Sequence, residues 1–227
     1  MSVTAKEKQN QAQLDRYFAQ GGVQLGPWTS HLWRDDPRHL GFLLARYKFC
    51  AKMLSGKRRV LEVGCGDAFG MRVVQQTVES ICGIDLEPQV VADAQRRLAV
   101  EQQQGVTLKI HDMTESGLEE KFEAAYSLDV IEHIPKEREH RFMTHLCQSL
   151  IQHAVCIIGT PNITASVYAS PFAAQGHINL KSAETLQTLL VPYFRHIFLF
   201  SMNDEVVHTG FYPMAHYLLA MGVELRV

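Results

Sequence analysis

The sequence predicts an α/β fold in which helices cover both faces of a mostly parallel β-sheet. Short apolar segments alternate with helical segments from residue 58 to about residue 200, and such alternation is typical of parallel strands joined by right-handed crossovers. A glycine-rich turn at residues 64–70 directly follows the first apolar segment. Ligands bind such sheets at the carboxyl ends of the strands, so this turn is the first place to look for a site.

The first 57 residues are expected to form a helical cap or lid, ahead of a domain at 58–227. Residues 21–30 are predicted to be a loop, because glycine and proline interrupt regular structure there. A helix is expected to begin near Asp36 and Pro37 and to stop near Gly56. The segment either closes over the site and excludes water, or only covers the edge of the sheet.

The pattern after residue 57 assigns the elements in order. Strands are expected where short apolar runs are too brief for a helix, at residues 58–64, 80–86, 106–112, 122–128, 153–161 and 195–202. Helices are expected where apolar residues recur at intervals of three and four, at residues 68–78, 88–102, 136–151 and 182–194.

The composition excludes several classes of protein. Hydrophobic residues make up 46% of the 227, as in a globular protein with one sizeable core. The 22 basic and 24 acidic residues balance to a formal charge of −2, so no nucleic-acid partner is expected. Neither an apolar signal core nor a run long enough to span a membrane is evident. We expect a cytoplasmic protein with five reduced cysteines.

The glycines at Gly64, Gly66 and Gly70 form the pattern G-x-G-x-x-x-G. A dinucleotide-binding loop has its third glycine one position earlier, where this chain has Phe69. Glu62 adds a carboxylate just before the turn, which suits a ligand with an ammonium group better than a pyrophosphate. A nicotinamide-dependent enzyme is therefore disfavoured.

With that acid, the segment VLEVGCGDAFG at residues 60–70 resembles the first motif of the class I S-adenosylmethionine-dependent methyltransferases. SLDVIEHIP at residues 127–135 resembles their fourth motif, in the form found in ubiquinone-biosynthesis-like members. The resemblance covers roughly residues 58–200. It implies a Rossmann-like, mostly parallel seven-stranded sheet with helices on both faces, and S-adenosyl-L-methionine as the methyl donor.

The resemblance also implies positions that bind the donor. Asp85, which ends the second strand, would accept hydrogen bonds from both ribose hydroxyls, since a carboxylate has several lone pairs. Asp112 would face the adenine amino group, with a helix cap as its alternative role, and Met113 would pack on the ring. The full expected set is Glu62, Gly64, Cys65, Gly66, Asp85, Leu86, Asp112, Met113 and Leu128.

Methyl transfer needs a nucleophile held behind the methyl carbon, and an amine or hydroxyl nucleophile must lose a proton. A histidine that titrates near neutral pH suits that role. His133, His177 and His208 each follow an expected strand and are the catalytic candidates, with structural packing as the alternative for each. Asp204 and Glu205 with His208 offer metal ligands, but a solvated polar loop is favoured there and no metal is predicted.

The acceptor is expected to be a small molecule, with O-methylation favoured over N-methylation. After the fourth strand the chain has Asp129 and Val130, where DNA amino-methyltransferases have an (N/D)PP(Y/F) motif, and RNA cytosine-C5 enzymes have a cysteine that is absent. Aromatic residues in 1–57, 161–180 and 203–213 suit a mid-sized organic acceptor. The alternative is a donor-binding protein without transferase activity, and a homodimer is left open.

Overall fold

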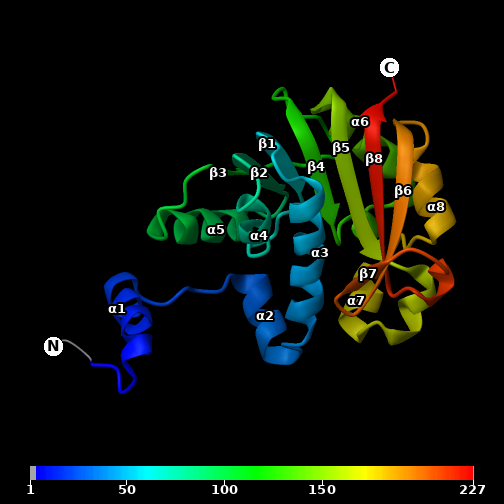
Figure 1. The fold of residues 1–227 in the computed structure, drawn as a ribbon. Coiled ribbons are helices and arrows are strands. Elements are labelled where there is room, and N and C mark those ends of the chain that lie inside the picture. The colour runs from blue at the N-terminus through cyan, green and yellow to red at the C-terminus, as the bar shows by residue number, and fades with distance from the viewer. Residues whose placement is uncertain (1–3, 227) are drawn as a thin grey trace.

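An eight-stranded β-sheet runs through the centre of the computed structural model, which describes residues 4–226 (Figure 1). The strand order is β3-β2-β1-β4-β5-β8-β6-β7. The strands are β1 Arg59–Val63, β2 Ser80–Asp85, β3 Val106–Ile110, β4 Phe122–Leu128, β5 Leu150–Pro161, β6 Phe194–Asn203, β7 Val206–His208 and β8 Tyr217–Leu225. The pairs from β3 to β5 are parallel, and those involving β8 or β7 are antiparallel. The expected mostly parallel α/β fold is confirmed.

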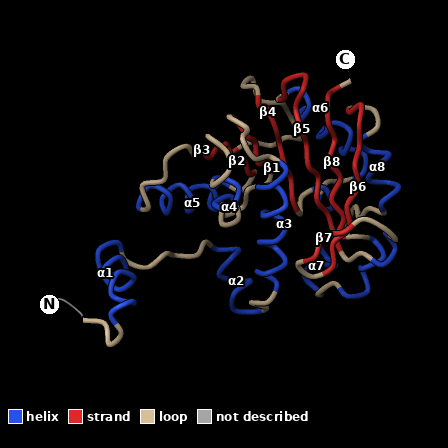
Figure 2. The backbone as a smooth tube through the Cα atoms, viewed as in Figure 1, coloured by secondary structure: helices blue, strands red, loops and turns tan. Residues whose placement is uncertain are grey.

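Helices lie on both sides of this sheet (Figure 2). They are α1 Gln11–Gln20, α2 Pro27–Asp35, α3 His39–Met53, α4 Met71–Gln75, α5 Pro88–Val100, α6 Glu139–Gln148, α7 Pro171–Gly176 and α8 Ala183–Leu190. One apolar cluster packs α3, α4 and α5 on the sheet through buried residues such as Cys50, Val74 and Val91. Another packs α6 and α8 through Phe142 and Leu186. Among the described residues, no helix is both long and apolar enough to cross a membrane.

The expected count of seven strands is wrong for the described part of the chain, because a short strand is added at one edge. β7 pairs with β6 through a hairpin whose turn contains Asp204 and Glu205. Asp204 has a φ of 49°, a left-handed conformation that aspartate tolerates better than most residues. The sequence pattern also leaves β8 unassigned. That strand enters between β5 and β6, with Ala220 opposite Ile158.

The N-terminal segment contains more helix than its glycines and prolines suggest. Residues 27–30, expected to be loop, begin α2, and Pro27 occupies the first turn, where its missing N–H is no loss. The expected helix near residue 37 forms as α3, which begins at His39. α1 buries none of its residues, and Figure 1 shows it standing apart from the sheet.

The carboxyl ends of β2, β1 and β4 meet at one edge of the sheet, because these strands are parallel neighbours. Between β1 and β4 the strand order reverses, and α/β sheets leave a crevice for ligands at that point. The glycine turn follows β1, Asp85 ends β2, and Asp129 follows β4. The topology therefore collects most of the predicted site residues in one place.

Candidate active site

A cavity of about 600 Å³ opens at these strand ends. Its wall includes all but one of the predicted donor-binding positions: Gly64, Cys65, Gly66, Asp85, Leu86, Asp112, Met113 and Leu128. Residues of α2 and α3 close the opposite side, and they are Trp28, Thr29, Leu32, Leu43 and Tyr47. The volume lies within the range of pockets that take cofactors and drug-sized ligands.

The glycine turn brings bare backbone to the cavity. Gly64 has a φ of 77°, and a Cβ at this position would lie 2.2 Å from Cγ2 of Val130. The amides of Gly64 and Cys65 both donate to the carbonyl of Ile84, at 2.8 and 3.0 Å. Only glycine fits such a turn without strain, because it lacks a side chain and tolerates positive φ. The turn is therefore held against β2 with its backbone facing the cavity.

Asp85 is fixed at the end of β2 by two backbone amides. Its Oδ2 accepts from the amide of Gly66 at 2.8 Å, and its Oδ1 accepts from the amide of Glu87 at 3.0 Å. Each carboxylate oxygen can accept more than one hydrogen bond. Asp85 is thus rigidly oriented and still able to accept from ligand hydroxyls.

Asp112 lines the cavity, and it caps no helix, because the described chain has none between β3 and β4. Its Oδ1 accepts from the amide and hydroxyl of Thr114, each at 2.7 Å. This is an Asx-type turn that orients the residues after β3. The next residue, Met113, is buried and lines the same wall, so an acidic and an apolar group stand side by side.

Glu62 is placed behind the cavity instead of on its wall. The carboxylate is buried and accepts hydrogen bonds from the hydroxyls of Tyr47 at 2.8 Å and Tyr126 at 2.7 Å. Burial raises its pKa to about 8, against the opposing effect of the two tyrosine hydrogen bonds. Glu62 therefore ties α3 to β1 and β4 beneath the site.

α2 is attached directly to the glycine turn. Asp67 of that turn accepts from the backbone amide of Thr29 at 2.8 Å and from its hydroxyl at 2.9 Å. Arg97 of α5 donates to the carbonyl of Asp67 at 2.7 Å. A Cβ on Gly26 would lie 2.4 Å from Cβ of Asp67, so the two segments are in close contact. Sequence reasoning missed Thr29, because no local signal links residues 38 positions apart.

Asp129 and Arg46 form an ion pair at the end of the cavity next to the turn after β4. Asp129, with a φ of 57°, lines the cavity and accepts from Nη1 of Arg46 at 2.7 Å. The Arg46 guanidinium also stacks on the ring of Tyr217, with Cζ 3.8 Å from the ring centroid. The buried Arg46 on α3 thus sets the position of the loop after β4.

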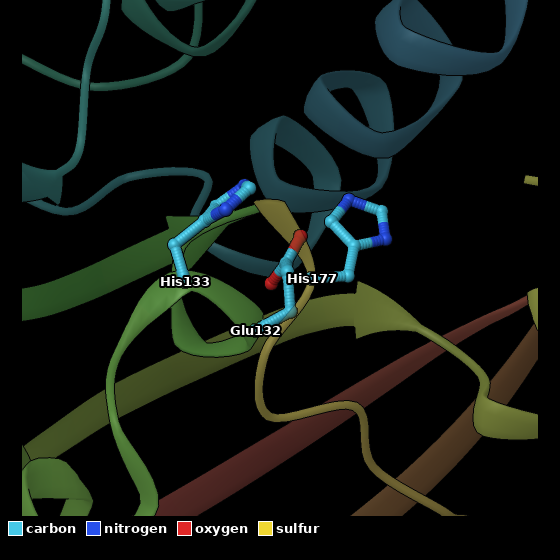
Figure 3. Close-up of side chains that lie close together, drawn as sticks. All are labelled: Glu132, His133 and His177. Atoms are coloured by element: carbon cyan, nitrogen blue, oxygen red, sulfur yellow. The ribbon is translucent and has the colours of Figure 1, made fainter. Parts of the chain in front are cut away.

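Glu132, His133 and His177 lie together beside that group, and we call them the acceptor cluster (Figure 3). Their ligand atoms all lie within 4.8 Å of one another. The rings of His133 and His177 are 5.2 Å apart between centroids and nearly perpendicular. His133 lines the cavity, whereas Glu132 and His177 stand behind it. Burial, together with the neighbouring His133, lowers the pKa of His177.

His133 and Glu132 of the acceptor cluster each have a hydrogen-bond partner outside the cluster. Nδ1 of His133 lies 2.9 Å from the carbonyl oxygen of Gly176. Because a carbonyl only accepts, Nδ1 carries the proton, which leaves Nε2 with a free lone pair in the neutral ring. Glu132 is completely buried, and its Oε2 accepts from the hydroxyl of Thr160 at 3.0 Å. Its adjacency to His133 in the fourth motif was the sequence signal that could have identified Glu132.

His208 is separated from the other two predicted catalytic histidines. It lies on β7, where its Nε2 is 2.9 Å from Oδ1 of Asn203, and it does not line the cavity. The side chains of the acceptor cluster lie close enough together to hold a metal ion. His208 belongs to no such group among residues 4–226. The structure thus brings His133 and His177 together and leaves His208 at the sheet edge.

Comparison with known proteins identifies the fold and a methyltransferase domain. Residues 60–152 match a family model described as a methyltransferase domain. This part of the chain is therefore a methyltransferase domain. No curated protein matches the sequence of this methyltransferase. Its closer affiliation with ubiquinone-biosynthesis-like members stays a prediction.

Solved structures share the fold of this methyltransferase at low sequence identity. The methyltransferase domain of bacterial CtHen1 has a TM-score of 0.66 at 17% identity, covering 81% of this chain and 98% of that one. The N-methyltransferase NodS from Bradyrhizobium japonicum, in complex with S-adenosyl-L-homocysteine, has a TM-score of 0.64 at 15% identity, covering 94% and 97%. A TehB-like SAM-dependent methyltransferase from Corynebacterium glutamicum has 0.58 at 16%, covering 95% and 97%.

The cavity of the methyltransferase has the chemistry that S-adenosylmethionine requires. The turn at Gly64 and Gly66 leaves backbone accessible, Asp85 offers acceptors for hydroxyls, and Met113 offers an apolar surface for a ring. S-adenosylmethionine is the methyl donor of this enzyme.

Proposed function

We propose that this methyltransferase transfers the methyl group of S-adenosylmethionine to a hydroxyl group of a small organic acceptor. The observation that carries the proposal is the position of His133, which lines the same cavity as the donor-binding positions. His177 and Glu132 lie next to it, with the ligand atoms of all three residues within 4.8 Å of one another. One cavity therefore combines a donor end with a proton-accepting end.

At the donor end, the proposed contacts follow from the wall of the cavity. Asp85 accepts from the ribose hydroxyls, Asp112 accepts from the adenine amino group, and Met113 packs against the adenine ring. The backbone at Gly64 and Gly66 faces the amino-acid part of the donor. Glu62 acts from behind, since it is buried outside the cavity wall, where two tyrosine hydroxyls bind it.

At the other end, the acceptor oxygen forms a bond to the methyl carbon while the C–S bond breaks and its electron pair stays on sulfur. The hydroxyl proton must leave during this step, and His133, which lines the cavity, would accept it on its free Nε2 lone pair. An in-line arrangement of oxygen, carbon and sulfur supplies much of the rate increase, on the order of 7–11 kcal/mol in favourable cases.

In this proposal residues 1–57 form a lid over the cavity, and α2 is the part of it that lines the cavity. α2 contributes Trp28, Thr29 and Leu32 to the cavity wall. Its two hydrogen bonds to Asp67 hold the closed lid against the glycine turn. Closing the lid excludes water from the reacting groups.

The first test is isothermal titration calorimetry of the full chain with S-adenosylmethionine and with S-adenosylhomocysteine. We expect one molecule bound per chain, and no heat from either ligand at high protein concentration would overturn the proposal. The second test incubates the enzyme and donor with paired aromatic phenols and anilines of similar size. Methylated phenols, detected by mass spectrometry, are the expected product, and methylation of the anilines alone would exclude O-methylation.

A variant pair then tests the proton acceptor. His133→Ala is expected to lower the rate of methyl transfer by about 10²–10⁴-fold while donor affinity stays within a few-fold. The control is His153→Ala, which removes an exposed histidine on β5 outside the cavity. Equal rates in the two variants would remove His133 from the reaction.

A further inference from the structure

We infer that the acceptor cluster, Glu132, His133 and His177, is a binding site for a divalent first-row transition-metal ion. The cluster joins two loops that are distant in sequence (Figure 3). Glu132 and His133 belong to the turn after β4, and His177 follows α7. The site itself stands on the geometry of these side chains, whereas its use in methyl transfer rests on the proposed function.

The spacing of the three ligand atoms fits one ion. Nitrogen and oxygen ligands lie about 2.0–2.2 Å from zinc, so two ligands of one ion are separated by at most roughly 4.2 Å. The three atoms already lie within 4.8 Å of one another. Figure 3 shows the Glu132 carboxylate between the two imidazole rings. Side-chain rotations that bring the three atoms closer together would close the set around a cation.

Glu132 supplies an independent indication of a missing partner. It is completely buried, and its Oε1 has no hydrogen-bond partner although Oε2 is bonded to Thr160. An unsatisfied buried acceptor costs about 1–3 kcal/mol, and more when it is charged. The nearby Arg46 directs Nη1 to Asp129 and acts on Glu132 through its charge, but it gives Oε1 no hydrogen bond. A cation bound between Glu132 and the histidines would compensate this oxygen.

The surroundings of the cluster match the supporting contacts of known metal sites. A metal-binding histidine usually donates its second ring N–H to a carbonyl or carboxylate. The Nδ1–H of His133 donates in this way to Gly176, and Nε2 is left for the ion. The amide of Asn179 donates to the carbonyl of Glu132 at 3.0 Å, which ties the two loops together on either side of the site.

The ligand types favour a transition metal over magnesium. Two imidazoles and one carboxylate suit Zn²⁺, Fe²⁺, Co²⁺ or Ni²⁺, whereas Mg²⁺ prefers a shell of oxygens. Three protein ligands leave at least one coordination position open, as in catalytic zinc sites. Because His133 lines the cavity, that position can receive the acceptor hydroxyl. The ion would then lower the pKa of the hydroxyl. In the metal-bound enzyme this would replace the proton-accepting role proposed for His133, because Nε2 would be bound to the ion and the proton would leave to solvent.

Untagged full-length protein freed of metal with a chelator tests the site directly. We expect calorimetry with Zn²⁺ to show one ion bound per chain, and Co²⁺ to develop the visible absorption of a nitrogen- and oxygen-ligated site. Mg²⁺ should bind at least about tenfold more weakly than Zn²⁺. Glu132→Gln, His133→Ala and His177→Ala should each weaken Zn²⁺ binding by at least about tenfold. His153→Ala is the matched control and should bind as the wild type does.

The outcomes separate this inference from the proposed function. Binding of S-adenosylhomocysteine by each variant verifies that it is folded. If the wild type binds that ligand but binds no Zn²⁺, or if His177→Ala binds Zn²⁺ as tightly as the wild type, the metal site is overturned and the methyltransferase proposal stands. If methyl transfer to phenols needs Zn²⁺ or Co²⁺ and is lost in His177→Ala, the use of the ion in the reaction is supported. Transfer that is unchanged in thoroughly chelated enzyme overturns that use.

Discussion

The contact between Thr29 and Asp67 should decide how long the enzyme retains its donor. The Thr29 hydroxyl donates to Oδ1 of Asp67 at 2.9 Å, and both residues are buried, with exposed fractions of 3% and 5%. A hydrogen bond to a charged group contributes roughly 1.5–3 kcal/mol. Thr29→Ala removes this bond and leaves only the backbone donor on that carboxylate. Opening of α2 should therefore become easier by about 2 kcal/mol.

If donor release requires α2 to open, 2 kcal/mol corresponds to roughly 30-fold faster dissociation. The assay is stopped-flow displacement of S-adenosylhomocysteine by excess competitor, followed for wild type, Thr29→Ala and Thr29→Ser. The serine variant keeps the hydroxyl and should remain near wild type. A dissociation rate for Thr29→Ala within twofold of the wild-type rate would refute the reasoning. The hydrogen bond between Thr29 and Asp67 would then have no part in donor release.

Three further substitutions test the donor end. Asp85→Ala should weaken S-adenosylmethionine and S-adenosylhomocysteine alike by roughly 10–100-fold in calorimetry, since it removes an acceptor for ligand hydroxyls; unchanged affinity would remove the ribose role. The pKa of Glu62, raised by burial from 4.5 to about 8, means that the folded chain holds this proton more tightly than the unfolded chain. Stability is then greatest below pH 4.5 and declines as the pH rises to about 8, by on the order of 5 kcal/mol. Glu62→Gln should abolish this contribution in urea unfolding measured across that range, and an identical pH profile would contradict the assignment. Gly64→Ala should lower the free energy of unfolding by about 2 kcal/mol or more, because its methyl would meet Val130 at 2.2 Å with φ at 77°; wild-type urea stability would show that the turn yields easily.

The donor end could be predicted from the sequence because its residues sit at fixed places relative to local elements. Gly64 and Gly66 follow a strand, Asp85 ends the next, and parallel pairing alone brings them to one edge. The same logic reaches Asp112 after β3. Glu62 shows its limit, since alternation along a strand does not reveal that two tyrosines occupy its carboxylate.

The positions of the catalytic candidates at the other end of the cavity depend on contacts between distant segments, which no local sequence pattern predicts. His177 meets His133 across 44 positions only because the loop after α7 folds back over the turn after β4, where Asn179 donates to Glu132. His208 comes after β6 in the chain, just as His177 comes after β5. The hairpin at Asp204, however, places His208 beside Asn203 and away from the cavity. The expected strand positions made His133, His177 and His208 equivalent candidates. The packing of the loops determines which of them lie together at the cavity.

The place of β8 in the sheet has a consequence for how the chain folds during synthesis. β8, Tyr217–Leu225, is made after all the other strands of this sheet, yet it lies between β5 and β6. Until it leaves the ribosome, β5 has an unpaired edge, and the β6–β7 hairpin has no strand to join. Such edges invite pairing with other chains. Truncation before Tyr217 should accordingly cause aggregation of the nascent enzyme, although every residue lining the donor cavity would already have been synthesised.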